Sequence, residues 1–208
     1  EGIRAVILTP HYKSTMSDET TQKRYAAYRK ACLMAEKVSP RLKLYLGEEL
    51  YYDSKMVQRL REGRALTLNG TQYVLAEFPV YVDYPYIRQA VQDLWAAGYL
   101  PVLAHIERYE VLKKMDCVEE LVELGAYIQV NAESVIGKAG FRTKHYLMKL
   151  IKKDLVHFVG TDAHNISSRP PQMKACAAYL KKKAGAEKAQ MLCSRNAKKI
   201  LKGEKIGE

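Results

Sequence analysis

Short apolar runs, each ending at a polar residue, recur along this chain and alternate with longer amphipathic stretches. Apolar runs bounded by turn signals are typical of strands that are buried on both faces of a parallel sheet. The six runs cover residues 4–9, 42–47, 73–76, 100–104, 126–130 and 155–161. The polar residues at or just past their ends are His11, Glu48, Glu49, Glu77, His105, Asn131 and Asp162.

The stretches between the runs read as helices, because their apolar residues recur at helical spacing. These stretches are residues 19–38, 84–97, 117–124, 141–153 and 171–183. Ser17 or Asp18 is placed to cap the first helix, and Gly98 and Gly125 lie where helix C-caps are expected. Strands that alternate with helices predict βαβ units and a parallel sheet, as either a doubly wound sheet or a barrel.

The polar residues at the strand ends favour the barrel. In (β/α) barrels the functional side chains come from the C-terminal ends of several strands and meet on one face. Each residue also has an ordinary explanation, such as a core histidine for His105, a lone buried acid for Glu77 or a helix-start acid for Glu49. A converging metal site explains six of them together: His11, Glu49, Glu77, His105, Asp162 and His164.

The segment Asp162-Ala163-His164 follows the last apolar run directly. In extended backbone the side chains at i and i+2 point to the same side, so Asp162 and His164 are predicted to share one ion. The alternative is a strand that ends in a polar turn. Mixed histidine and carboxylate ligands suit Mn, Fe or Zn, and several of them together indicate a multinuclear site for hydrolysis.

Seven segments carry a family resemblance over nearly the whole chain. They are Thr9-Pro10-His11, Gly47-Glu48-Glu49-Leu50-Tyr51-Tyr52, Ala76-Glu77-Phe78, residues 101–109, Gln129-Val130-Asn131, residues 161–165 and Arg169-Pro170-Pro171. In these the chain resembles the PHP (polymerase and histidinol phosphatase) superfamily. It is most similar to the manganese-dependent protein tyrosine phosphatases of Gram-positive capsule and exopolysaccharide loci. The most specific segments are His105-Ile106-Glu107-Arg108-Tyr109 and Asp162-Ala163-His164-Asn165 with Arg169-Pro170-Pro171.

The resemblance implies a single domain over residues 1–208, folded as a distorted (β/α)7 TIM-like PHP barrel. It makes the six residues of the predicted site ligands of a multinuclear Mn²⁺ centre, with Fe, Zn or Mg as alternatives. It also makes Arg108 and Arg169 catalytic residues that bind the substrate phosphate, because a guanidinium matches phosphate bidentately. The alternatives are an ion pair of Arg108 with Glu107 or Glu110, and a solvated loop arginine at position 169.

The implied activity is that of a metal-dependent phosphotyrosine-protein phosphatase, in which a metal-activated hydroxide attacks the phosphomonoester directly. The implied partner is the phosphotyrosine-bearing tail of a tyrosine kinase of polysaccharide synthesis. The chain has no Cys-X5-Arg loop, so no phosphocysteine intermediate is expected. The alternatives are a small-molecule phosphatase of the histidinol-phosphate type, a nuclease-like PHP domain, and a non-catalytic regulator that binds the kinase.

The chain departs from the family pattern at its start. The family opens with a strand that ends in a His-X-His pair, whereas this chain begins at Glu1-Gly2-Ile3 and has no His-X-His. We therefore expect a fragment or a processed copy without the first βα unit and with weakened metal binding. The oligomeric state is left open.

Composition limits which partners the protein can bind and where in the cell it is expected. The net charge of +11 would steer an anionic phosphopeptide to the protein, although basic residues on solvated helix faces have the same composition. No nucleic-acid motif is present, so no nucleic-acid partner is expected. The four cysteines show no close pairing, which favours free thiols and a cytoplasmic location. Five tyrosines lie between the predicted ligands and serve either core packing or an aromatic rim for the substrate: Tyr51, Tyr52, Tyr81, Tyr84 and Tyr86.

Overall fold

A computed structural model describes residues 1–207, apart from the side chains of residues 18 and 19. The strands of the described chain are β1 (Ala5–Leu8), β2 (His11–Tyr12), β3 (Lys43–Leu46), β4 (Glu49–Tyr51), β5 (Tyr73–Glu77), β6 (Leu100–Leu103), β7 (Tyr127–Asn131) and β8 (Phe158–Gly160). The α-helices are α1 (Asp18–Val38), α2 (Met56–Arg61), α3 (Tyr84–Ala96), α4 (Met115–Glu123), α5 (Ala132–Ile136), α6 (Phe141–Lys152), α7 (Met173–Ala184), α8 (Ala186–Gln190) and α9 (Asn196–Lys202). Single 3₁₀ turns lie at Leu68–Gly70, Ile106–Arg108 and Glu110–Lys113, and a π-helical turn at Met191–Arg195.

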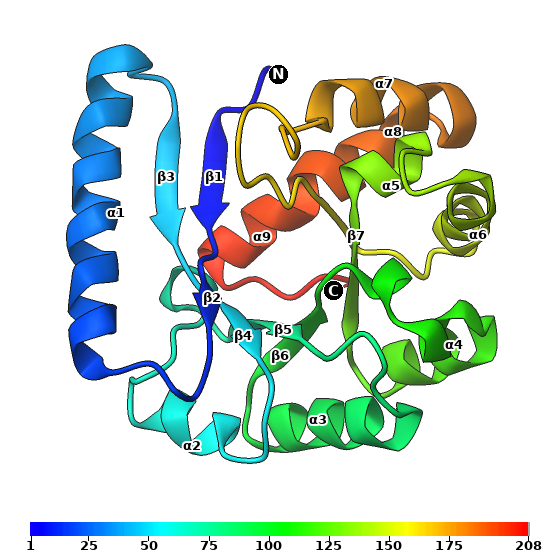
Figure 1. Cartoon of the computed structure of the whole chain (residues 1–208). Helices are drawn as coiled ribbons and strands as arrows, with labels where there is room; N and C mark the ends of the chain where they lie inside the picture. Colours follow the sequence, from blue (N-terminus) through cyan, green and yellow to red (C-terminus); the bar gives the residue numbers. More distant parts are fainter. Residues whose placement is uncertain (208) are drawn as a thin grey trace.

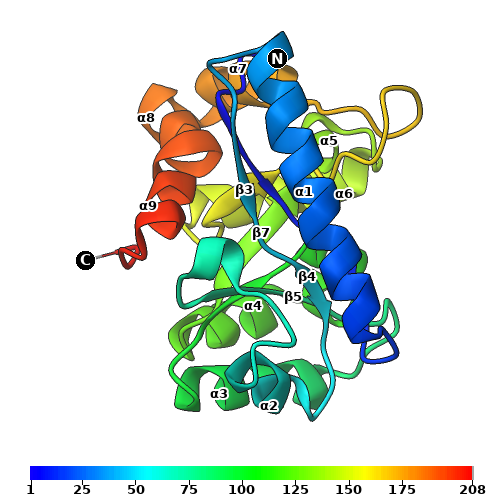
Figure 2. The same ribbon diagram turned by 90° about the vertical axis from the view of Figure 1, so that its left-hand side faces the viewer.

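The strands form a curled parallel half-barrel. Six of them pair in the order β2-β4-β5-β6-β7-β8, and β1 pairs in parallel with β3. Only two residues separate β1 from β2, and two separate β3 from β4, so each pair runs on as one interrupted strand. The helices α1, α2, α3, α4, α6 and α7 follow one another around the outside of this sheet (Figure 1). Seen from the side, α1 runs alongside β3 and contacts it (Figure 2).

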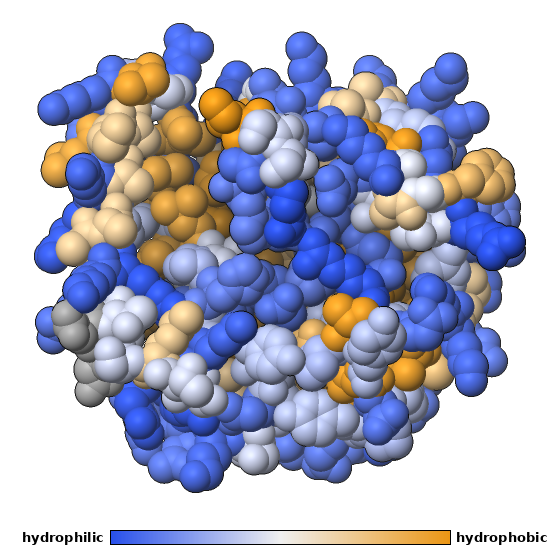
Figure 3. Space-filling view, viewed as in Figure 1, coloured by the Kyte–Doolittle hydropathy of each residue, from blue (hydrophilic) through white to orange (hydrophobic). Residues whose placement is uncertain are grey.

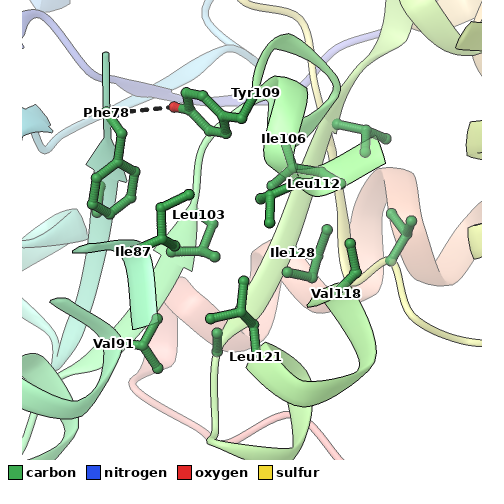
Figure 4. Packing of buried hydrophobic residues seen from close by; sticks show 14 of the residues in the cluster. Phe78, Ile87, Val91, Leu103, Ile106, Tyr109, Leu112, Val118, Leu121 and Ile128 are labelled. Carbon is green, nitrogen blue, oxygen red and sulfur yellow. Dashed lines mark hydrogen bonds between the residues drawn. The ribbon is translucent and has the colours of Figure 1, made fainter. Parts of the chain in front are cut away.

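Side chains alternate between the two faces of the sheet, as the period of two in a strand requires. Outward residues such as Val74, Leu103 and Ile128 join the larger core beneath the helices. Figure 4 shows part of this core, where the Tyr109 hydroxyl accepts a hydrogen bond from the backbone N–H of Phe78 (3.0 Å). A second, smaller core lies on the inward face of the sheet, where Ile200 of α9 and Leu68 pack against strand residues. These strand residues are Tyr73, Leu100, Val102, Tyr127 and Phe158. Both faces of the strands are thus buried, which explains the continuous apolar runs.

The predicted helices are confirmed to within three residues at each end, and Gly98 and Gly125 follow α3 and α4 with φ of +86° and +94°. Ser17 is the N-cap residue of α1, but its hydroxyl contacts the Thr20 hydroxyl and caps no backbone N–H. The side chain of Asp18 lies outside the described residues.

The strands differ from the predicted runs in two ways. The last run was expected from residue 155, but β8 begins at Phe158. The first two runs were expected to end before His11 and Glu49, but each resumes as a short strand that contains that residue. The short helices α2, α5, α8 and α9 were not predicted, because five to seven residues carry too little periodicity.

The four cysteines, which all lie in the described part of the chain, are free thiols. Within residues 1–207, no helix combines the length and the apolar character needed to span a membrane.

The partly buried imidazole of His157 makes stability depend on pH. Its Nδ1 accepts a hydrogen bond from the backbone N–H of Ile128 (3.0 Å), and burial lowers the pKa of His157 from 6.5 to about 4. Between these values the unfolded chain binds more protons than the folded one, so stability falls as pH drops through this window. From pH 7 to pH 5 the wild type should lose up to about 2 kcal/mol more unfolding free energy than His157→Gln. Urea denaturation at both pH values measures this, and equal losses in the two proteins would contradict it.

Candidate metal centre

Two imidazoles and two carboxylates meet on the inner face of the half-barrel, at the carboxyl ends of its strands. His11 and Glu49 are direct partners in the β2–β4 ladder, and Glu77 is the last residue of β5. The Nε2 atom of His11 lies 3.2 Å from Glu49 Oε2 and 3.9 Å from Glu77 Oε2. One ligand atom from each of the three residues lies within 4.8 Å of the others, a spacing that one metal ion could bridge.

His105 completes this group from the end of β6. Its Nε2 lies 2.9 Å from Glu49 Oε1 and 3.4 Å from Glu77 Oε1. Burial alone would lower the pKa of His105, but the carboxylates of Glu49 and Glu77 outweigh burial and raise it to about 9. For the Glu77 carboxylate the direction is opposite: burial alone would raise its pKa, but His105 and then His11 hold the pKa of Glu77 below its ordinary value.

The donor set fits a divalent cation. The His105 ring is buried; among the described residues its Nε2 has only the ion-pair contacts with Glu49 and Glu77, and its Nδ1 has no hydrogen-bond partner. Buried polar atoms without partners are rare and call for an explanation such as an ion. Imidazole nitrogens combined with carboxylate oxygens suit Mn, Fe or Zn, so His11, Glu49, Glu77 and His105 are the residues that would hold the cation.

A second group surrounds Asp162. Its Oδ2 accepts hydrogen bonds from Arg108 (2.5 Å), from Asn131 Nδ2 (2.9 Å) and from Arg169. The Asp162 side chain is 11% exposed, while those of Arg108 and Arg169 are 35% and 33% exposed. The carboxylate therefore holds two guanidinium groups side by side at the mouth of the site, where an anion from solvent can reach them.

His164 lies between the two groups. Its Nδ1 is 3.6 Å from Asp162 Oδ1, and its ring centroid is 5.7 Å from that of His11. Asp162 and His164 do lie close together, but the predicted reason was wrong, and their sharing of one ion stays a prediction. Residues 161–164 are not a strand, and Asp162 has a φ of +46°, so a turn brings the two side chains together.

The backbone at the site adopts a rare conformation. Among the described residues four non-glycines have a positive φ, and two of them are His105 (+34°) and Asp162 (+46°). Such residues cost energy and are enriched at functional sites. The backbone N–H of His105 donates to Gln129 Oε1 (2.6 Å), which stabilises its turn. A Cβ on Gly160 would come within 2.4 Å of Gln129 Nε2, so a larger residue at this position would displace the Gln129 amide.

The structure thus brings all six predicted ligands and both arginines to one mouth. Neither alternative for the arginines holds, because both pair with Asp162, while Glu107 accepts from the backbone N–H of Asn131 and Glu110 pairs with Lys113. Among the tyrosines, Tyr52 packs in the core against Phe78, and Tyr81 is 92% exposed.

Sequence reasoning missed four residues that support the site. Asn131 was noticed as the end of a run, and Gln129 was a polar residue inside that run, which is a usable signal. Glu48 lies at the end of its run but is not one of the six predicted ligands, and it is turned away from the cluster toward Arg24. Nothing in the sequence separates Arg24 from the other basic residues of its helix.

A cavity of about 800 Å³ lies beside the cluster, between β1 and α1 on one side and β8 and α9 on the other. Its walls include five of the predicted ligands, together with apolar side chains such as Val6, Leu8 and Ile200. Figure 3 shows the apolar surface of this region as a hollow over β1 and β3, at the upper left of the molecule.

A curled parallel sheet with histidines, carboxylates and paired arginines at its carboxyl edge is typical of metal-dependent hydrolases. The chain belongs to the capsular polysaccharide synthesis CpsB/CapC family, whose model matches residues 1–202. This confirms the resemblance to the phosphatases of capsule loci.

Two named relatives match over almost the whole chain. It is 32% identical to tyrosine-protein phosphatase CpsB of Streptococcus pneumoniae, over 99% of this chain and 87% of the relative. It is 33% identical to tyrosine-protein phosphatase YwqE of Bacillus subtilis (strain 168), over 99% of this chain and 81% of the relative. Its fold matches one chain from the crystal structures of YwqE from Bacillus subtilis and CpsB from Streptococcus pneumoniae, which are called unique metal-dependent tyrosine phosphatases. The TM-score is 0.90 and the identity is 32%, over 99% of this chain and 83% of that chain.

The ligand assignment predicts that His11→Asn weakens Mn²⁺ binding roughly tenfold or more, because one of four donors is removed. His145→Asn is the matched control, since His145 is exposed and lies on α6. Isothermal titration of the two variants and the wild type measures the affinities. Equal affinity in all three proteins would show that His11 is not a ligand.

Proposed function

We propose that this protein is a metal-dependent phosphatase that removes phosphate from phosphotyrosine in a partner protein. The observation that carries the proposal is the pairing of two features at one mouth: the His11–Glu49–Glu77–His105 cluster and the two arginines on Asp162. The first suits a divalent cation, and the second suits a phosphate. The activity in the names of its relatives agrees with this chemistry.

We also propose that the half-barrel is part of a PHP-type barrel. The curled sheet with its outer ring of helices supports a distorted (β/α)7 barrel of the PHP type, organised as one domain over residues 1–208.

In the proposed site, His11, Glu49, Glu77 and His105 hold the cation, and Asp162 and His164 lie next to it as further ligands. The proposed ion is Mn²⁺, in a multinuclear cluster. When bound, such ions lower the pKa of water and neutralise charge on phosphoryl oxygens.

Arg108 and Arg169 bind the phosphoryl group of the substrate. Each guanidinium presents several N–H donors in a plane that matches phosphate oxygens, and the shared Asp162 carboxylate fixes the direction in which both point. They stabilise the negative charge on the transferred group without any reorganisation during the reaction. The leaving group is the phenolate of tyrosine, whose conjugate acid has a pKa near 10. It therefore departs with less help from a general acid than the alkoxide of serine would need.

The proposed partner is the phosphotyrosine-bearing tail of a tyrosine kinase of capsular polysaccharide synthesis, met in the cytoplasm. The family's role in capsular polysaccharide synthesis supports this choice. The net charge of +11 supports attraction of an anionic phosphopeptide and predicts that association slows at high salt.

Hydrolysis of a phosphotyrosyl peptide should require Mn²⁺ and stop on chelation, since the cluster rather than a cysteine does the chemistry. Replacement of all four cysteines by alanine should leave the rate within about twofold of the wild type. Release of inorganic phosphate measures both effects, with histidinol phosphate as the competing substrate. Activity that survives chelation, that depends on a cysteine, or that is faster on histidinol phosphate would overturn the proposed function.

Arg108→Lys and Arg169→Lys should each lower kcat/KM for the phosphopeptide roughly 100-fold, because a lysine cannot reproduce the planar contact with phosphate. Arg88→Lys is the control: Arg88 pairs with Glu120 on the outer helices, with 2.7 Å between Nε and Oε1. Initial rates at several peptide concentrations give the parameters. If both site variants match Arg88→Lys, the arginines do not bind substrate.

A further inference from the structure

Arg24 reaches from α1 to the sheet and contacts both β2 and the residue that precedes β4. Its guanidinium contacts the carboxylate of Glu48 and the backbone carbonyl oxygen of His11, and it also meets the sulfur of Met16. The Arg24 side chain is 13% exposed and that of Glu48 is fully buried. The other carboxylate oxygen of Glu48 accepts a hydrogen bond from the backbone N–H of Leu66 (2.9 Å).

This ion pair lies directly behind two predicted ligands. Glu48 precedes Glu49 in the chain, and Arg24 holds the carbonyl of His11 itself. His11 and Glu49 face each other across the β2–β4 ladder, where the N–H of Glu49 donates to the carbonyl of Pro10 (3.1 Å). The pair thus connects the backbones that carry both side chains.

The ladder itself offers little rigidity at this point. β2 has two residues and β4 has three, and β2 is the edge strand of the six-stranded sheet. So short a strand makes few ladder hydrogen bonds, and an edge strand is paired on one side only. A buried ion pair is costly to desolvate and is a weak source of stability, so its presence here calls for another role.

We propose that Arg24 and Glu48 are positioning residues of the metal centre, which fix the backbones of His11 and Glu49 so that the imidazole and the carboxylate reach one cation. The inference rests on the proposed function in one respect, namely that His11 and Glu49 are ligands. Arg24 and Glu48 themselves bind no cation in it and act only through those two residues.

The chain offers a matched control in Arg59 and Asp53. Arg59 Nη1 lies 2.7 Å from Asp53 Oδ1, and the Arg59 side chain is 10% exposed, close to the value for Arg24. Among the contacts of the described residues, neither partner touches a predicted ligand. Loss of this pair should lower stability without moving the metal centre.

The test compares Arg24→Met, Arg24→Lys, Glu48→Gln and Arg59→Met for Mn²⁺ affinity by titration calorimetry and for Tm without metal. We expect Arg24→Met and Glu48→Gln to weaken Mn²⁺ binding roughly 10- to 100-fold, the size of effect known for residues that orient ligands. Arg24→Lys should recover part of that loss, because it keeps the charge. Arg59→Met should bind Mn²⁺ like the wild type although its Tm falls.

A kinetic measurement separates positioning from catalysis. In Arg24→Met the Mn²⁺ concentration for half-maximal phosphatase activity should rise by the same factor as the dissociation constant, and kcat should return toward the wild-type value at saturating Mn²⁺. If Arg24→Met does not fold, Arg24→Lys and Glu48→Gln carry the same comparison with smaller perturbations.

Wild-type Mn²⁺ affinity in the Arg24 and Glu48 variants, or an equal loss in Arg59→Met, would overturn the inference. These results would leave the proposed function intact if hydrolysis still needs Mn²⁺. Conversely, the expected order of affinities without any hydrolysis of phosphotyrosyl peptide would overturn the proposed function and support the positioning role. A wild type that binds no divalent cation would overturn both.

Discussion

The inner face of the half-barrel changes from apolar to charged within two residues, and the site depends on this change. Along β5 the inward side chains are Tyr73, Leu75 and then Glu77. On one side of Glu77 the inward side chains form the smaller apolar core with α9, and on the other side carboxylates and imidazoles lie close together. Charged groups next to an apolar core are poorly solvated, so each needs a partner of opposite charge. The interleaving of His11, Glu49, Glu77 and His105 provides those partners.

Asp162 links this cluster to the arginines through its two oxygens. Oδ2 accepts from Arg108, Arg169 and Asn131, whereas Oδ1 faces His164. One carboxylate can therefore orient the two guanidinium groups with one oxygen while the other stays on the side of the histidines. This division explains how a residue predicted as a metal ligand is found as the anchor of two guanidinium groups.

The sequence predicted the parallel α/β fold because the strands are buried on both faces and the helices are long. Five helices were found to within three residues at each end, and the strand ends pointed to His105 and Glu77. The breaks between β1 and β2 and between β3 and β4 were not predictable. Strands of two or three residues depend on pairing with distant neighbours, which local sequence does not encode. The role of Arg24 was hidden for the same reason, because its partners lie on other elements.

The close approach of Gln129 in β7 to Gly160 in β8 connects the last strand to His105, which follows β6. The Gln129 amide fills the space that any side chain at position 160 would occupy, and its oxygen holds the backbone of His105 in a left-handed turn. A single methyl group at position 160 would displace that amide and release the turn. A substitution at a residue that has no side chain should therefore disturb the site without removing any of its polar groups.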